Sequence, residues 1–265
     1  MKKYRNILFL ALLIVYMILV SGFIGGKERL QKISALRIEV VDSTENQFIQ
    51  SASIRSILEH KKYNIFGNES SQIDLEGIEH SLRSRQIIKD AQAFITEPGV
   101  LHLEISQKKP FVRVFNRYGQ GYYLDQEGNI IPLSQSFSPF VIVANGFIAE
   151  PFTVGKTLNI NDAKHDSLPR SLHTIYDVYK LASFITADKF WNSQIEQIYV
   201  NSNYDFELIP RVGSHIIELG RVEHLDEKFG NLKLLYTEGF SKLGWNQYGK
   251  ISLKYKNQVV CTKIQ

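Results

Sequence analysis

Apolar and polar positions alternate in three stretches of the N-terminal half, a period typical of half-buried β-strands. The three strands are predicted at residues 36–40, 88–95 and 100–105. The last two flank Glu97-Pro98-Gly99, which pairs proline with glycine as a type II turn requires. The pattern therefore predicts a hairpin whose sheet is joined by an earlier strand.

Two helices are predicted between the first and second of these strands. Apolar residues recur at helical spacing over residues 54–58, with Ser51 or Ser53 as the N-cap residue. Asp74 suits the N-cap of a second helix, which has apolar positions on one face of residues 75–82. The order strand, helix, helix, strand, strand predicts a compact module with two helices on one face of a three-stranded sheet. The edges of such a sheet can accept a strand from another protein.

The C-terminal half is richer in predicted strands and has two predicted helices. The strands are predicted at residues 111–115, 122–124, 130–132, 140–144, 195–200, 206–209, 215–219, 250–255 and 259–261. Asn145-Gly146 is a strong hairpin signal after the fourth of them. The helices are predicted at residues 172–185, starting from Ser171 or Ser167, and at residues 225–236. Because strands and helices do not alternate as βαβ units, we expect a curved, mostly antiparallel sheet with flanking helices.

The N-terminus contains an apolar segment long enough to cross a membrane. No charged side chain occurs between Ile7 and Ile24, and a helix of that length spans roughly 27 Å. The basic flank of residues 1–6 predicts a cytoplasmic N-terminus, with the body outside the cytoplasm. A cleaved signal peptide is the alternative, but no small-residue cleavage site follows the segment. We therefore expect a transmembrane helix at residues 7–24 and a linker at residues 25–34.

Composition narrows the classes of protein to which the body can belong. A net charge of +4, dispersed along the chain, gives no basic stripe for nucleic acid. The single cysteine, Cys261, cannot form an internal disulfide, so the core alone must hold the fold. Cys261 is most simply a small buried apolar residue.

Candidate chemistry is sparse. Glu76 with His80, and His224 with Glu227, each offer two metal ligands on one helix face, but a site needs at least three. Residues 125–129 resemble a calcium loop only faintly and are predicted to be a turn. No nucleotide-binding or nucleophile motif occurs. We predict no catalytic residue, no metal site, no cofactor and no small-molecule substrate.

Four segments resemble the bacterial FtsQ family of cell-division proteins, called DivIB in some lineages. They are residues 103–114 around Lys109-Pro110, residues 121–132, Leu219-Gly220-Arg221 with the helix after it, and residues 251–260. The order of these segments, and the length of the chain, match the family architecture. The resemblance implies a short cytoplasmic tail, one transmembrane helix, a POTRA domain at residues 35–107 and a β domain at residues 108–265. The tail is shorter than is common in the family, and Lys109 stands where arginine is usual.

The resemblance also implies a function without catalysis. Proteins of this family recruit the FtsB–FtsL pair to the divisome at the septum of the cytoplasmic (inner) membrane, with the body in the periplasm. Their partner site uses the last strands and the helix near the Leu-Gly-Arg motif. Carried over to this chain, the implied partner-binding residues are Arg221, Leu253, Tyr255, Asn257 and Val259.

Two other functions remain open on the sequence. A POTRA module also occurs in envelope protein assembly and secretion systems, although those proteins generally carry repeated modules or a membrane barrel. A membrane-anchored hydrolase of envelope polymer would need a cleft with a perturbed carboxylate or histidine.

Overall fold

The computed structural model describes residues 12–19, 32–41, 48–61, 63–96, 99–134, 137–149, 159–160 and 173–264. The chain divides into two compact units, residues 1–107 and residues 108–265. Each unit is described by itself.

The predicted transmembrane segment is described only in part. Residues 12–19 are helical and their apolar side chains are exposed. The rest of residues 7–24, the tail and most of the linker lie outside the described residues. Within the part of the chain that is described, no helix is both long enough and apolar enough to cross a membrane. The spanning segment therefore stays a prediction.

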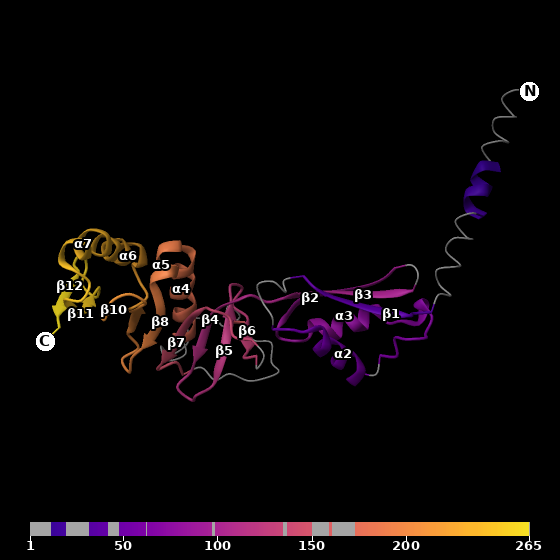
Figure 1. Ribbon diagram of the computed structural model, residues 1–265, viewed down its shortest axis with the longest axis horizontal. Helices are drawn as coiled ribbons and strands as arrows, with labels where there is room; N and C mark the ends of the chain where they lie inside the picture. The colour runs from indigo at the N-terminus through magenta and orange to yellow at the C-terminus, as the bar shows by residue number, and fades with distance from the viewer. Residues whose placement is uncertain are drawn as a thin grey trace, which may run out of the picture. The chain divides into compact units, whose positions relative to one another are not determined.

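The first unit has the predicted order of elements with one short addition. Its elements are β1 (Ala35–Val40), α2 (Ser51–His60), the 3-10 turn η1 (Ser70–Gln72), α3 (Leu75–Arg83), β2 (Ile88–Thr96) and β3 (Val100–Gln107). The sheet order is β1-β3-β2, with β1 parallel and β2 antiparallel to β3. Helices α2 and α3 lie on the same face of this sheet (Figure 1). Ile33, which the sequence assigns to the linker, is buried and exchanges backbone hydrogen bonds with Gly67 and Asn68.

The two helices of this unit begin in different ways. Asp74 caps α3 as predicted, because its carboxylate accepts a hydrogen bond of 2.8 Å from the Gly77 amide. Gly77 leaves room for that carboxylate, which a β-carbon would contact. The predicted serine cap of α2 is wrong: Gln50 is the N-cap residue and makes no side-chain cap. Ser51 instead starts the helix, and the helix is held by its buried face at Ile54 and Leu58.

The second unit is built on one nine-stranded sheet. Its strands are β4 (Pro110–Phe115), β5 (Gly121–Asp125), β6 (Ile130–Pro132), β7 (Ile142–Gly146), β8 (Ile195–Val200), β9 (Phe206–Pro210), β10 (Ile216–Gly220), β11 (Tyr248–Ser252) and β12 (Val260–Lys263). Their spatial order is β12-β11-β10-β9-β8-β7-β4-β5-β6. Three neighbouring pairs are parallel, namely β4–β7, β7–β8 and β10–β11, and the rest are antiparallel. The sheet is therefore mostly antiparallel, as predicted, with parallel pairing on both sides of β7 and between β10 and β11.

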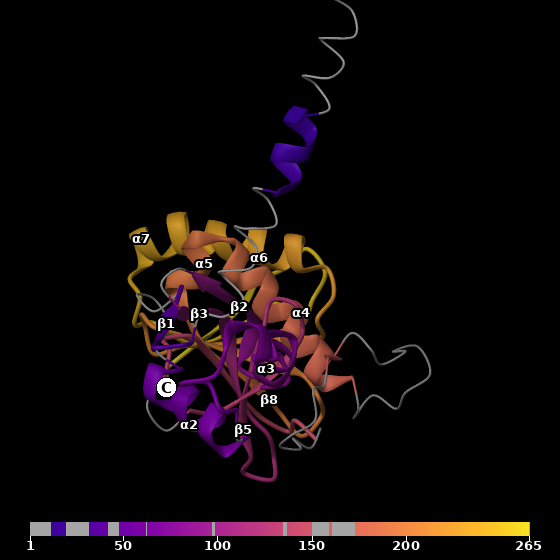
Figure 2. The ribbon, with the colours of Figure 1, turned by 90° about the vertical axis from the view of Figure 1, so that its right-hand side faces the viewer.

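The helices of the second unit lie on one side of its sheet, as both views show (Figures 1 and 2). They are α4 (Thr174–Ala187), α5 (Lys189–Gln194), α6 (Leu225–Leu234), the π-helical turn η5 (Leu235–Gly239) and α7 (Phe240–Leu243). Buried apolar residues of the central strands form one core cluster with those of α4, α5 and α6. The predicted helix at residues 225–236 is thus interrupted by η5, and α5 is a helix that the periodicity does not predict.

The predicted hairpin at Asn145-Gly146 is wrong. Both residues belong to β7, which runs parallel to β4 on one side and to β8 on the other. Gly146 has a φ of +103°, and a β-carbon there would collide with the carbonyl oxygen of Val200. The glycine is therefore needed for the close approach of β7 to β8 rather than for a turn.

An aromatic cluster joins the helices of this unit. Asp188 caps α5, accepting hydrogen bonds from the Phe190 and Trp191 amides. The Trp191 ring then meets Phe229 of α6 edge-on at 5.1 Å and Tyr236 of η5 at 5.6 Å between centroids. The cluster fixes α6 relative to α5 and hence to the sheet.

His215 contributes a buried titratable group to the same cluster. Its side chain is 1% exposed, and Nε2 lies 2.7 Å from the hydroxyl of Tyr236. Burial lowers the pKa of His215 and raises the pKa of Tyr236. Burial therefore favours the neutral imidazole, and among the described residues the Nδ1 atom has no hydrogen-bond partner.

We expect acid to destabilise the second unit through His215. Because the pKa is lowered on folding, the unfolded chain binds the proton near its ordinary pKa of about 6.5 while the folded unit does not. The free energy of unfolding should be highest above that pH and fall below it, by at most about 1.4 kcal/mol per pH unit. Urea unfolding followed by tryptophan fluorescence measures this unit, since Trp191 and Trp245 both lie in it. His215→Gln should flatten the pH dependence and the exposed His80→Gln should not; equal slopes in both variants would contradict the assignment.

Candidate partner-binding site

The last strand, β12, forms one edge of the nine-stranded sheet. It pairs antiparallel with β11, Ile251 lying opposite Cys261 and Ser252 opposite Val260. No strand pairs with its other side among the residues that the structure describes. Val260 is 42% exposed, whereas Cys261 is half-buried against the core. Burial also raises the pKa of the Cys261 thiol. The side chain packs against the core as predicted but is only partly buried.

A pocket of about 310 Å³ lies between the β11–β12 connection and the start of α6. We call it the α6 pocket. Its lining residues are Glu223, His224, Glu227, Lys228, Asn231, Leu253, Lys254, Tyr255, Lys256 and Gln258. Of these, Leu253 is buried and Tyr255 is 60% exposed. The pocket therefore places an exposed aromatic ring beside charged groups.

Hydrogen bonds hold the β11–β12 connection against α6. The amide of Asn257 donates to Oε1 of Glu227 at 3.0 Å, and Asn257 adopts a left-handed φ of +56° that asparagine tolerates. At the other end, the Leu253 amide donates to the Glu218 carbonyl at 2.9 Å, which continues the pairing of β11 with β10. These contacts set the position of Tyr255 between them.

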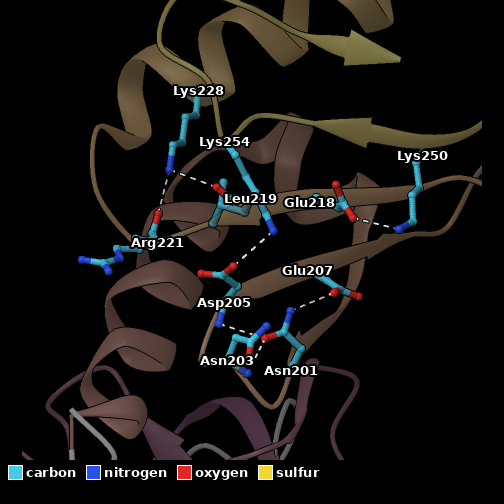
Figure 3. Close-up of polar contacts among 10 residues, drawn as sticks. All are labelled: Asn201, Asn203, Asp205, Glu207, Glu218, Leu219, Arg221, Lys228, Lys250 and Lys254. Carbon is cyan, nitrogen blue, oxygen red and sulfur yellow. Dashed lines mark hydrogen bonds and ion pairs between the residues drawn. The ribbon is translucent and has the colours of Figure 1, made fainter. Parts of the chain in front are cut away.

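Lys228 ties α6 to the end of β10. Its ammonium donates to the carbonyl oxygens of Leu219 at 3.0 Å and Arg221 at 2.8 Å (Figure 3). Burial lowers the pKa of Lys228, and the nearby Glu223, Asp205 and Glu227 oppose that effect. Lys228 thus has a structural role, because its hydrogen bonds hold the loop after β10 against α6.

The Leu219-Gly220-Arg221 motif has a clear physical basis. Leu219 is fully buried, and Gly220 turns the chain at a φ of +73° where the Lys254 stem packs against it. Arg221 is consequently placed on the surface, and its guanidinium points away from Lys228 and Lys254 (Figure 3). No ion pair of this guanidinium occurs among the described residues.

Two further lysines near the site are engaged with carboxylates. Lys254 lies 3.1 Å from Asp205, and Lys250 lies 2.9 Å from Glu218 (Figure 3). The hydrogen bond from Lys250 lowers the pKa of Glu218, so this pair stays charged at neutral pH. These pairs leave Arg221 as a cation available to a partner.

The structure places the five predicted residues in four settings. Tyr255 and Leu253 line the α6 pocket, one exposed and the other buried. Asn257 contacts α6 through its backbone, and Val259 packs partly against the core just before β12. Arg221 lies on the neighbouring loop, linked to α6 through Lys228. The Leu253 side chain is 2% exposed, so little of it is available for contact in the unbound chain.

Sequence reasoning missed Lys228, Asp205 and Lys254. Asp205 and Lys254 are 49 residues apart, so no local pattern reveals their pairing. His224 and Glu227, considered as metal ligands, both line the α6 pocket, but no group of three metal-ligating side chains occurs in the described part of the chain. Glu227 instead accepts the Asn257 amide.

Comparison with protein families matches both units. Residues 109–262, more than half of the chain, match the family model described as FtsQ/DivIB, C-terminal related. Residues 31–106 match the model of the POTRA-like domain. No curated protein matches the chain.

Proposed function

Since the chain belongs to the FtsQ/DivIB family of cell-division proteins, we propose that it is a non-enzymatic scaffold of the divisome. It recruits an FtsB–FtsL-like pair through its C-terminal strand. Residues 7–24 anchor it as a single-pass protein of the cytoplasmic membrane, with the N-terminus in the cytoplasm. The body acts in the periplasm at the division septum.

The observation that carries this proposal is the edge of β12. An edge strand presents unpaired backbone N–H and C=O groups, which an extended segment of a partner satisfies by adding a strand. The opposite edge of the same sheet is less suited, because β6 has three residues and ends in Pro132, which lacks an amide hydrogen. The geometry therefore favours strand addition at β12.

The α6 pocket supplies specificity beside that edge. An exposed tyrosine gives a partner a large contact area at low entropic cost and is enriched among residues that dominate binding energy. A guanidinium such as that of Arg221 can form planar, bidentate hydrogen bonds with a carboxylate. We accordingly infer a partner segment that pairs with β12, covers Tyr255 and places an acidic side chain near Arg221.

Photocrosslinking in dividing cells tests the proposal. The full-length protein should concentrate at midcell, and a photoreactive residue at Val260 on β12 should capture an FtsB-like protein. The same probe at Leu133, a 37%-exposed residue that follows β6, is the matched control. A uniform membrane distribution, or equal capture at both positions, would refute recruitment through β12.

A further inference from the structure

Two side chains of α3 bond to the backbone at the outer edge of β2 in the first unit. β2 is an edge strand, because the sheet order is β1-β3-β2. The carbonyl of Ala91 accepts a hydrogen bond of 2.7 Å from Nη2 of Arg83. The amide of Ala93 donates one of 2.8 Å to Oε1 of Glu79. Two backbone groups that would otherwise face a neighbouring strand are therefore already bonded.

The two side chains also hold each other. Arg83 Nη2 lies 3.0 Å from Oε2 of Glu79, one turn earlier on α3. Arg83 Nε lies 2.8 Å from Oδ1 of Asp90 on β2 itself. The guanidinium thus bridges helix and strand with two different nitrogens, a geometry that lysine cannot reproduce.

We propose that Glu79 and Arg83 form a latch that closes the β2 edge to strand addition. In a parallel pairing, one residue of the partner strand would donate to the Ala91 carbonyl and accept from the Ala93 amide. Arg83 and Glu79 already make these two hydrogen bonds. An antiparallel partner would need both groups of each alanine, and the latch takes one from each. A strand can therefore pair with this edge only after Glu79 and Arg83 withdraw.

The latch gives the two units different capacities for strand addition, since it blocks the β2 edge of the first unit while the β12 edge of the second is open within the described part of the chain. The sequence suggests that any exposed edge of the POTRA-like sheet can accept a strand. The contacts of α3 block strand addition at the centre of β2. An unprotected edge there would be open to pairing with other chains. Strand addition is thereby directed away from β2 in the resting protein, whatever the partner of β12 proves to be.

Hydrogen exchange and peptide binding test the latch in the full-length protein. The variant Glu79→Ala with Arg83→Ala should exchange the Ala93 amide roughly tenfold faster than wild type. It should also bind a synthetic peptide of residues 88–96, whose own strand can pair with the opened edge, while wild type should not. Glu76→Ala with Arg85→Ala removes the same charges from exposed positions of the same segment and should match wild type in both measurements.

Arg83→Lys keeps the charge and is the milder substitution, so it tests the latch even if the double variant misfolds. Lysine offers one nitrogen where arginine uses two, so this variant should also bind the peptide, more weakly. Unchanged exchange at Ala93 in the double variant, or peptide binding by wild type as tight as by the double variant, would overturn the latch. An equal gain in the Glu76/Arg85 control would overturn it as well.

Discussion

Tyr255→Asp should weaken binding of the proposed FtsB-like partner at least 30-fold, an effect of about 2 kcal/mol or more, because exposed tyrosines beside a pocket commonly dominate an interface. The substitution also places a carboxylate where we infer an acidic segment to lie. The fold should persist, since the ring is 60% exposed and the connection is held by backbone contacts at Leu253 and Asn257. Binding of purified partner, and midcell recruitment in cells, are the two measurements.

Tyr118→Asp is the matched control for this prediction. Tyr118 is 57% exposed on the β4–β5 turn, toward the other end of the strand order. It should leave partner binding unchanged and show that a new surface charge is harmless in itself. Normal midcell recruitment by the Tyr255 variant would remove the α6 pocket from the binding site, and a defect in both variants would point to a non-specific effect.

Trp191→Ala should cost about 3–5 kcal/mol of the free energy of unfolding. The indole is 2% exposed and fills the space between α5, α6 and η5, where it meets Phe229 and Tyr236. The substitution leaves a cavity that the neighbouring rings close only in part. Because α6 forms one wall of the α6 pocket, the variant should also lose affinity for the partner.

Urea unfolding with fluorescence of the remaining Trp245 measures this loss directly. Leu234→Ala is a suitable control, since Leu234 ends α6 and is 59% exposed. It should change stability by less than about 0.5 kcal/mol. A similar small cost for Trp191→Ala would mean that α6 is positioned by contacts other than this cluster.

Local sequence patterns predicted the elements well and their arrangement less well. The cap at Asp74 was predictable because the acceptor and the amide that it serves are three residues apart. The role of Gly146 was not, because its neighbour Val200 is more than fifty residues away and only the fold brings β7 beside β8. The interruption of α6 by η5 likewise has no counterpart in the apolar spacing, which continues through Leu235 and Tyr236.

The candidate site shows the same limit. Tyr255 and Arg221 were identified by resemblance to a family, and the structure explains their exposure by a polar connection and by the turn at Gly220. Lys228 and Asp205 could not be found in this way, because a lysine that donates to carbonyls and an aspartate that pairs with a lysine 49 residues away look like ordinary surface residues in a sequence. The burial of Leu253 was likewise not visible in the sequence, and its contact with a partner stays a prediction.

The position of β7 has a consequence for how the second unit acquires its structure. Strands β4 to β6 are joined by short turns, and so are β8 to β10, so each group can assemble from residues that are close in the chain. β7 pairs with β4 on one side and β8 on the other, and both pairings join distant segments. Closing such loops is entropically costly and slow. β10 and β11 also pair across a long connection. The β7–β8 pairing joins the most distant segments of the sheet, so insertion of β7 is the expected slow step of folding, and it completes the nine-stranded sheet whose edge is β12.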